Sequence, residues 1–376
     1  MIGTSATPAR PRPFPLLMGM FLSLCGPALP AFAGNLELTL ASAMSGTRTP
    51  AMGALTMRNG RVAEIAVHGL RRNDRAELVR LDDQWLIGSD AKPMVATLVA
   101  RLVDRGLLSW ETPLSTMLPD LASEMRPEYR SVTLRELLSH YSGLPHDVSD
   151  LKYFNGFFSD ARPLPRQRLD YVVRALKDAP VVPPGTAFSY SNTGFVIAAV
   201  IAERAAGMPF EKLMRREVFQ PLGMTSAGYG QPGAGEPRGH VGGKPAAMND
   251  GNPLMFAPAG NIHLSLRDWA KFCLDQLDGP TGGGRLLTAA SYRLMQTAPA
   301  GKEVGLGWGV VDSVAGRKGP ALTHAGSDGN WYAVVVLFPT LDDGALVVAN
   351  AGENMGGDKA ARAALKALLP DLAPSQ

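Results

Sequence analysis

Strand patterns stand at both ends of this chain, and that arrangement most constrains the fold it can adopt. Near the amino end, Asn59-Gly60 separates two β-prone runs and readily adopts the positive φ angles of a type I′ hairpin turn. Toward the carboxyl end, further strand-like runs cover residues 305–311, 331–338 and 345–349. Because the intervening segments read mainly as helix, we expect both ends to share one sheet. The sequence therefore predicts an α+β fold, an antiparallel sheet built from both chain ends and flanked by helices.

Helical periodicity dominates the middle of the chain. Apolar residues recur at helical spacing after Ser89, and Gly106 can end that helix. Residues 228–258 are rich in Gly, Pro and small side chains, which predicts a long surface loop. We therefore expect a mainly helical subdomain inserted at roughly 105–300. Further helices are expected at residues 134–140, 193–206, 265–277 and 359–369.

The first 33 residues have the composition of a secretion signal. Two arginines precede a short apolar run, and Ala31-Phe32-Ala33 matches the small-residue pattern of a cleavage site. We expect cleavage after Ala33, a mature domain of residues 34–376, and a periplasmic or secreted location. A membrane anchor is disfavoured because prolines interrupt a short apolar stretch, and lipid attachment at Cys25 is disfavoured because bulky Leu24 precedes it. No stable membrane insertion is expected after cleavage.

Charge and motif content limit which partners, metals and cofactors we expect the chain to bind. The formal net charge is +3, and removal of the first 33 residues takes away two arginines and no acidic residue, so a nucleic-acid partner is not expected. The histidines and cysteines show none of the familiar metal-binding spacings, and no glycine-rich nucleotide motif follows a strand. We predict no metal, no cofactor, and a small-molecule or short-peptide substrate. The oligomeric state stays open.

The strongest catalytic candidate is the pair Ser89 and Lys92, at the start of the long helix. Residues three apart lie on one helical face, so the lysine amine can reach the serine hydroxyl. A serine hydroxyl becomes a good nucleophile when a base takes its proton, and a lysine with a lowered pKa can be that base. The helix start also lets the backbone N–H of Ser89 point toward a developing oxyanion.

The same spacing recurs at Ser149-Asp150-Leu151-Lys152, directly before Tyr153-Phe154-Asn155. We expect these residues to form a loop, from which groups so close in sequence cannot approach a substrate from different sides. This second copy is therefore predicted to be unrelated to catalysis. We likewise interpret His240-Val241-Gly242 as part of a loop and Cys273 as a buried apolar side chain.

Candidate partners for Ser89 stand far away in the sequence, each at a structural boundary. Tyr190 and Asn192 precede an apolar helix. The phenol can carry a proton to a leaving group, and the amide can bind both a substrate carbonyl and Lys92. His324 and Gly326 end an apolar segment and are expected just before a strand, where Gly326 would let a substrate backbone lie close.

The motifs Ser89-x-x-Lys92, Tyr190-x-Asn192 and His324-x-Gly326, in this order, resemble the penicillin-recognising serine hydrolases, specifically the class C β-lactamase-like family. Other segments, such as residues 137–145 and 305–309, resemble the same family, so the resemblance covers nearly all of the chain after residue 33. It implies the β-lactamase/D,D-peptidase-like fold and a covalent acyl-enzyme that water then releases.

The resemblance also implies roles for individual residues. Ser89 would be the acylated nucleophile, and Lys92 and Tyr190 would share general-base and general-acid work. Asn192 would position the substrate. The oxyanion hole would consist of the backbone N–H groups of Ser89 and Ser327.

One departure from the family pattern concerns the substrate. Many class C β-lactamases carry lysine where His324 stands, whereas peptidases and other hydrolases of the family often carry histidine. Histidine is mostly neutral above its pKa, so selection for an anionic drug is expected to be weaker. We therefore expect a D,D-peptidase, amidase or esterase ahead of an efficient β-lactamase.

Two alternatives to this hydrolase stay open. One is a catalytically silent protein that binds cell-wall peptide or penicillin, which the intact motifs disfavour. The other is an α/β-hydrolase with Ser327 as nucleophile, within Ala325-Gly326-Ser327-Asp328-Gly329. That reading requires a doubly wound parallel sheet, and the hairpin at Asn59-Gly60 argues against it.

Overall fold

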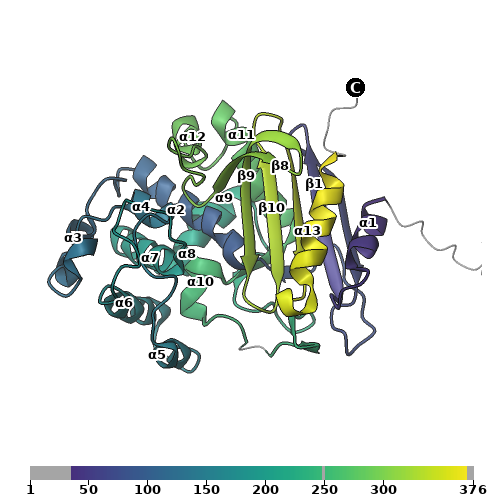
Figure 1. The fold of residues 1–376 in the computed structure, drawn as a ribbon, viewed down its shortest axis with the longest axis horizontal. Helices are drawn as coiled ribbons and strands as arrows, with labels where there is room; N and C mark the ends of the chain where they lie inside the picture. Colours follow the sequence, from purple (N-terminus) through teal and green to yellow (C-terminus); the bar gives the residue numbers. More distant parts are fainter. Residues whose placement is uncertain (1–34, 248–249, 371–376) are drawn as a thin grey trace, which may run out of the picture. The chain divides into compact units, whose positions relative to one another are not determined.

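A six-stranded antiparallel sheet joins segments from the two ends of the chain (Figure 1). The structure is a computed structural model that describes residues 35–247 and 250–370, and the strand order is β2-β1-β11-β10-β9-β8. The predicted α+β fold is confirmed, and the Asn59-Gly60 hairpin joins β1 to β2. The expected signal segment lies outside the described residues. The strands are β1 (Ala51–Arg58), β2 (Arg61–Gly69), β8 (Gly309–Val314), β9 (Arg317–Ser327), β10 (Tyr332–Phe338) and β11 (Asp343–Ala349).

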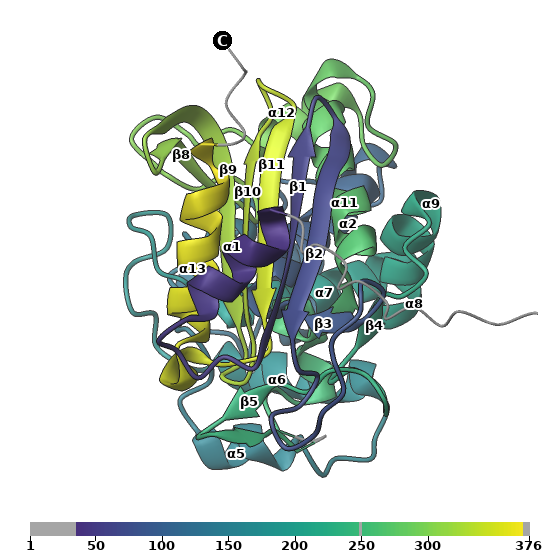
Figure 2. The ribbon, with the colours of Figure 1, turned by 90° about the vertical axis from the view of Figure 1, so that its right-hand side faces the viewer.

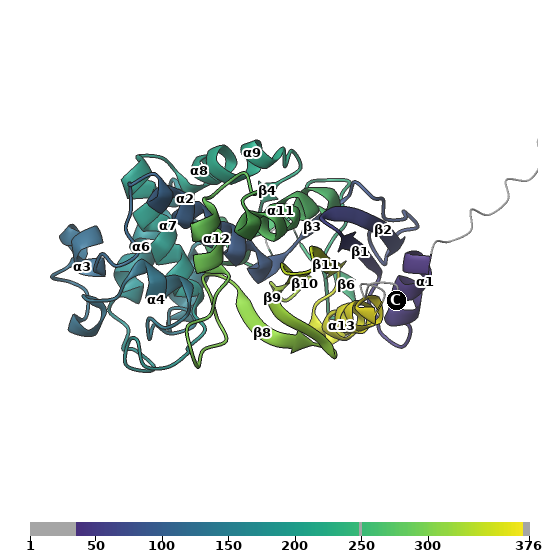
Figure 3. The same cartoon turned by 90° about the horizontal axis from the view of Figure 1, so that it is seen from above.

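Alternate side chains of these strands enter two separate hydrophobic layers. On β1, Met52 and Ala54 pack in the layer formed with α1 (Asn35–Met44) and α13 (Gly357–Leu368). Ala51 and Leu55 belong to the larger core on the other face, which α11 (Leu266–Asp278) covers. Successive residues of a strand point to opposite faces, so a strand buried on both faces needs apolar residues throughout. Figures 2 and 3 show α1 and α13 on one face and α11 on the other.

Helices and two small sheets fill most of the chain between β2 and β8. The 15-residue α7 is buried from Thr193 to Glu203. No single helix in the described part of the chain is long and apolar enough to cross a membrane; α7 with Phe210–Leu222 passes by length and composition only as a pair bent by 78°. The boundaries of a helical subdomain stay a prediction. The helices are α2 (Lys92–Asp104), α3 (Leu114–Met117), α4 (Leu134–Leu138), α5 (Leu151–Gly156), α6 (Leu164–Ala175), α7 (Asn192–Ala206), α8 (Phe210–Met214), α9 (Gln220–Leu222), α10 (Ala257–Gly260) and α12 (Ala289–Met295). The small sheets consist of β3 (Gln84–Leu86), β7 (Ile262–Ser265) and β4 (Gly228–Tyr229), and of β5 (His240–Val241) and β6 (Lys244–Pro245).

The structure corrects the sequence prediction around β9. His324 and Gly326 lie inside this strand, not before one, and residues 305–308 are irregular instead of extended. The strand was missed because its first residues, Arg317-Lys318-Gly319-Pro320, read as a polar turn. They extend β9 along β8, where little apolar burial is required.

Two further predicted loops are also corrected. Residues 151–156 form the short helix α5, which begins where the side chain of Asp150 accepts a hydrogen bond from Tyr153 N at 2.9 Å. His240 lies in β5 and is fully buried. Its Nδ1 lies 2.7 Å from Asn350 O, and Asn73 N donates to its Nε2 at 3.1 Å. Both ring nitrogens are therefore engaged in holding the fold.

A buried ion cluster that joins α6 to α7 and α8 leads to a prediction about stability. Arg168 has no exposed side-chain area and pairs with Glu203 at 2.6 Å and Glu211 at 2.8 Å. Arg168→Met leaves Glu203 buried without its cation, so we expect the free energy of unfolding in urea to fall by about 3 kcal/mol. Arg204→Met removes the exposed pair with Asp120 and is the matched control, with an expected change below about 1 kcal/mol. Equal losses in the two variants would contradict the assignment.

Candidate active site

Ser89 lies on a 3₁₀ turn, η1 (Gly88–Ala91), which connects β3 to α2. Ile87 N donates to Ile262 O at 3.1 Å and fixes the start of this turn to β7. Pro93 stands in the first turn of α2, where a missing N–H breaks no helical hydrogen bond. The turn leaves Ser89 partly exposed while its neighbours Gly88 and Asp90 are buried.

Two of the predicted residues contact the hydroxyl of Ser89. Lys92 Nζ lies 2.9 Å from Ser89 Oγ, and Tyr190 donates its phenol proton to the same oxygen at 2.8 Å. Lys92 Nζ also donates to Asn192 Oδ1 at 2.7 Å and to Ala259 O at 2.5 Å. The structure thus brings together residues that stand about a hundred positions apart in the chain. Ala259, whose backbone oxygen completes the set, was not predicted.

Burial decides the protonation state of Lys92. The side chain is fully buried, and desolvation lowers its pKa to about 7, against the opposing charges of Asp147 and Asp90. A neutral amine has two N–H groups and one lone pair. The two N–H groups match Asn192 Oδ1 and Ala259 O, which leaves the lone pair for the hydroxyl proton of Ser89. This geometry suits a general base.

Burial shifts the pKa of Tyr190 in the opposite direction from that of Lys92. Burial raises the pKa of its phenol, so the neutral form that donates to Ser89 is stabilised. His140 stacks on the Tyr190 ring with the centroids 4.4 Å apart, and burial holds the pKa of His140 well below its ordinary value. Ser191 N donates to His140 Nδ1 at 3.0 Å, so that nitrogen carries no proton. His140 therefore supports Tyr190 as an uncharged ring, and no sequence signal assigned it this place.

Two glycines allow β9 to approach the turn that carries Ser89. A Cβ on Gly326 would lie 2.1 Å from Ile87 O and 2.6 Å from Ser89 N, and one on Gly88 would lie 2.4 Å from Ser327 N. Gly88 also has a φ of +53°, which glycine adopts readily. Gly326 was expected to make room for a substrate backbone, but its missing side chain makes room for the turn. The backbones at Ser89 and Ser327 consequently lie side by side, as a two-donor oxyanion hole requires.

His324 pairs with a buried carboxylate. Its Nδ1 lies 3.3 Å from Asp90 Oδ1, and the two side chains are 10% and 0% exposed. Burial raises the pKa of Asp90, and neither of its oxygens accepts a hydrogen bond within residues 35–247 and 250–370. Asp90 stands inside the predicted serine–lysine motif, but no role was predicted for it. The carboxyl group of Asp90 therefore lies buried next to the imidazole of His324.

Asp147 and its neighbour His146 lie beside Asn192. Asp147 Oδ1 accepts a hydrogen bond from Asn192 Nδ2 at 3.2 Å, and the His146 ring lies over Tyr190 with the centroids 5.3 Å apart. The side chains of His146 and Asp147 are 60% and 33% exposed. These residues were not predicted, because neither belongs to a motif and only the fold places them here.

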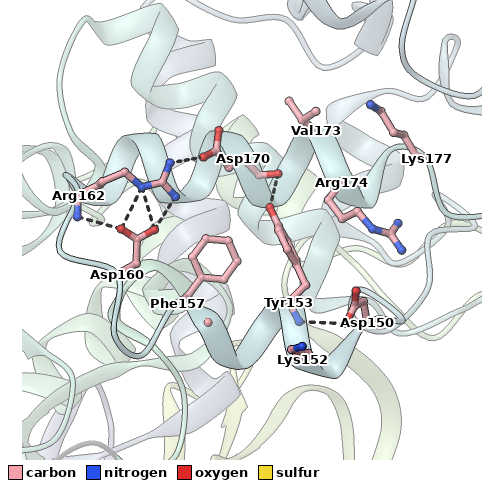
Figure 4. Close-up of a pocket in the computed structure, with 11 residues that line it drawn as sticks. Asp150, Lys152, Tyr153, Phe157, Asp160, Arg162, Asp170, Val173, Arg174 and Lys177 are labelled. Carbon is pink, nitrogen blue, oxygen red and sulfur yellow. Dashed lines mark hydrogen bonds and ion pairs between the residues drawn. The ribbon is translucent and has the colours of Figure 1, made fainter.

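The second copy of the serine–lysine spacing lies elsewhere. Ser149 Oγ donates to Asp178 at 3.4 Å, and Lys152 lines a cavity of about 790 Å³ formed by α5, α6 and the segment between them (Figure 4). Neither Ser89 nor Tyr190 lines this cavity. In the part of the chain that the structure describes, no three His, Cys, Asp or Glu side chains gather to hold a metal ion.

Comparison with known proteins adds family evidence to this geometry. Residues 36–369 match the family model described as Beta-lactamase. The chain is 26% identical over 302 residues to the putative penicillin-binding protein PbpX of Bacillus subtilis, covering 78% of this chain and 71% of that protein. It is 32% identical over 208 residues to esterase EstB of Burkholderia gladioli, covering 53% and 52%. In fold it is similar to the octameric penicillin-binding protein homologue from Pyrococcus abyssi, with a TM-score of 0.72 and 22% identity over 90% of this chain and 77% of that one.

The lowered pKa of Lys92 sets the expected pH dependence. Below pH 7 the amine is an ammonium and cannot accept the Ser89 proton, so kcat/KM for a p-nitrophenyl ester should fall about tenfold per pH unit there and level off above it. A His146→Gln variant, which removes the exposed ring beside Tyr190, should keep the same midpoint. A midpoint that moves with His146, or a profile that is flat through pH 7, would refute the assignment.

The contact between Gly326 and η1 makes a second prediction. Gly326→Ala drives the turn away from β9, so the rate of Ser89 acylation should fall at least about a hundredfold. Gly233→Ala is the matched control, because a Cβ there meets no atom within 4 Å. The time course of labelling with an active-site acylating probe, in samples quenched at successive times, measures both rates. An unchanged rate in Gly326→Ala would show that the close approach is dispensable.

Proposed function

Because the chain belongs to the beta-lactamase family, whose members are serine hydrolases, we propose that it cleaves an amide or ester bond through an acyl-enzyme on Ser89. One observation carries the proposal: Ser89 Oγ lies between Lys92 Nζ at 2.9 Å and the Tyr190 hydroxyl at 2.8 Å. The pKa of Lys92 is lowered to about 7, and burial raises the pKa of Tyr190. A proton acceptor and a proton donor therefore flank one hydroxyl.

Acylation follows from this arrangement. Lys92 takes the proton of Ser89 as Oγ forms a bond to the substrate carbonyl carbon. The carbonyl oxygen becomes an oxyanion, which the N–H groups of Ser89 and Ser327 stabilise. Tyr190 donates its proton to the leaving nitrogen or oxygen as that bond breaks. The proton held by Lys92 then restores the phenol, and the enzyme is left acylated with both side chains neutral.

Water completes the cycle. It attacks the acyl carbon and gives one proton to the neutral base, and the ester bond to Ser89 Oγ breaks with return of a proton to that oxygen. The net reaction adds one water across the scissile bond. Asn192 holds the Lys92 amine in place through its Oδ1 and remains available to a substrate through its NH₂ group.

The substrate proposal rests on the surroundings of His324. A fixed lysine charge is absent at this position, and the histidine that replaces it lies 3.3 Å from Asp90. The missing fixed charge weakens selection for a carboxylate-bearing drug. We infer a D,D-peptidase, amidase or esterase ahead of a β-lactamase. The similarity to a penicillin-binding protein and to an esterase supports this range.

The proposal includes export. The basic residues, short apolar run and Ala31-Phe32-Ala33 site support cleavage after Ala33 and a periplasmic or secreted enzyme. A small-molecule or short-peptide substrate is part of the same proposal. A catalytically silent binding protein is the second candidate. The arrangement of Ser89, Lys92 and Tyr190 does not favour it.

Labelling tests the proposed nucleophile. A fluorophosphonate probe should modify the purified protein at Ser89, mapped by peptide mass spectrometry, because the probe reacts with activated serines. Ser89→Ala should remove the label and lower turnover of a p-nitrophenyl ester by at least about a thousandfold, with the thermal unfolding midpoint retained. Ser149→Ala, in the second copy of the motif, should keep both the label and the activity.

Other labelling outcomes would count against the proposal. A label on Ser327 would indicate a different nucleophile. A folded protein that takes no label would point to the silent binding protein.

A further inference from the structure

The side chain of Asp147 lies against the amide of Asn192, on the side away from Lys92. Asp147 Oδ1 and Oδ2 lie 3.2 and 3.4 Å from Asn192 Nδ2. Asn192 Oδ1 is turned toward Lys92 Nζ, at 2.7 Å. Because the oxygen is committed to the lysine, the NH₂ group is the part of Asn192 that a substrate meets. A group that approaches it meets the carboxylate of Asp147 at the same time.

The backbone holds Asp147 firmly in this place. Asn192 N and Thr193 N donate to His146 O at 2.9 and 3.3 Å, and Ser191 Oγ donates to Pro145 O at 2.7 Å. The next residue, Val148, is buried. The segment around Asp147 is therefore fastened to the first residues of α7, the same residues that place Tyr190 and Asn192.

Asp147 brings negative charge to a site with little fixed positive charge. The side chain is 33% exposed, so a ligand can reach it. Its charge acts on Lys92, whose pKa is nevertheless lowered to about 7, so the lysine is largely neutral above that pH. His146 Nδ1 lies 2.5 Å from Asp147 Oδ2, but this ring is 60% exposed and a ligand can displace it at little cost.

We propose that Asp147 selects acyl donors that carry a free α-ammonium group, such as amino-acid amides and peptides with an unblocked amino end. This inference rests on the proposed hydrolase function. Ser89 Oγ, Lys92 Nζ, Asn192 and Asp147 form one chain of contacts of 2.9, 2.7 and 3.2 Å. An ammonium one carbon away from the scissile carbonyl would lie on the Asn192 side of Ser89, where the carboxylate of Asp147 supplies its counter-charge.

Matched substrates test this selection. We compare kcat/KM near pH 7 for alanine p-nitroanilide and N-acetylalanine p-nitroanilide, each as both enantiomers, so that the leaving group is the same and uncharged. The acetylated compound keeps an N–H but loses the charge. The wild-type protein should favour the free amine by at least about tenfold. Asp147→Asn, which keeps an acceptor for Asn192, should abolish the preference, and Asp147→Glu should retain part of it.

Asp150→Asn is the matched control. It removes the same charge three residues along the chain, at an exposed position where asparagine caps α5 as well as aspartate does. Its ratio of the two kcat/KM values should equal that of the wild type. Because each ratio compares two substrates on one variant, a change in the base Lys92 cancels out.

Ser89 labelling separates failure of this inference from failure of the proposed function. Where neither anilide is cleaved, we measure how strongly alaninamide and N-acetylalaninamide protect Ser89 from the fluorophosphonate. The ratio of their two protection constants then replaces the ratio of the kcat/KM values. Labelled Ser89 with equal ratios in the wild type and Asp147→Asn would overturn selection by Asp147 and leave the hydrolase intact. A Ser89 that takes no label would overturn the proposed function itself.

Discussion

Removal of the Lys92 amine from water is the interaction on which the candidate site depends. An ordinary lysine is an ammonium at neutral pH and cannot take a proton from serine. Burial under α7 and α10 brings the pKa to about 7, while three oxygens hold the nitrogen in one place. The same desolvation raises the pKa of Tyr190, so a single dry environment separates a proposed base from a proposed acid. The large helical core around α7 thus has an electrostatic role as well as a stabilising one.

The sheet contributes the other half of the site. Its central strands are buried on both faces, between α1 and α13 on one side and α11 on the other, which makes β9 a rigid support for His324 and Ser327. Gly326 and Gly88 then let that support touch the turn of the nucleophile through backbone atoms alone. Near the site, Asp147 adds a carboxylate where an anionic substrate would require a cation.

The sequence predicted features that have a local cause. The Asn59-Gly60 hairpin, the helix after Ser89 and the apolar strands near the carboxyl end follow from turn chemistry and periodicity, and the motif residues Ser89, Lys92, Tyr190 and Asn192 do come together. Features with a tertiary cause were missed. Strand β9 begins with a polar run that only pairing with β8 extends, and His140, Asp147 and Ala259 O reach the site through packing that no local pattern encodes.

The contact between Gly88 and Ser327 also has a consequence for the timing of assembly. The two backbones come from a turn near residue 88 and from a strand that ends at residue 327, and β1 pairs with β11, which is made later still. A ribosome completes the turn that carries Gly88 long before it completes strand β9. The two proposed oxyanion donors therefore cannot face each other until nearly the whole chain has been synthesised and the sheet has closed. An unfinished or unfolded chain would carry the serine and the lysine without the assembled site around them.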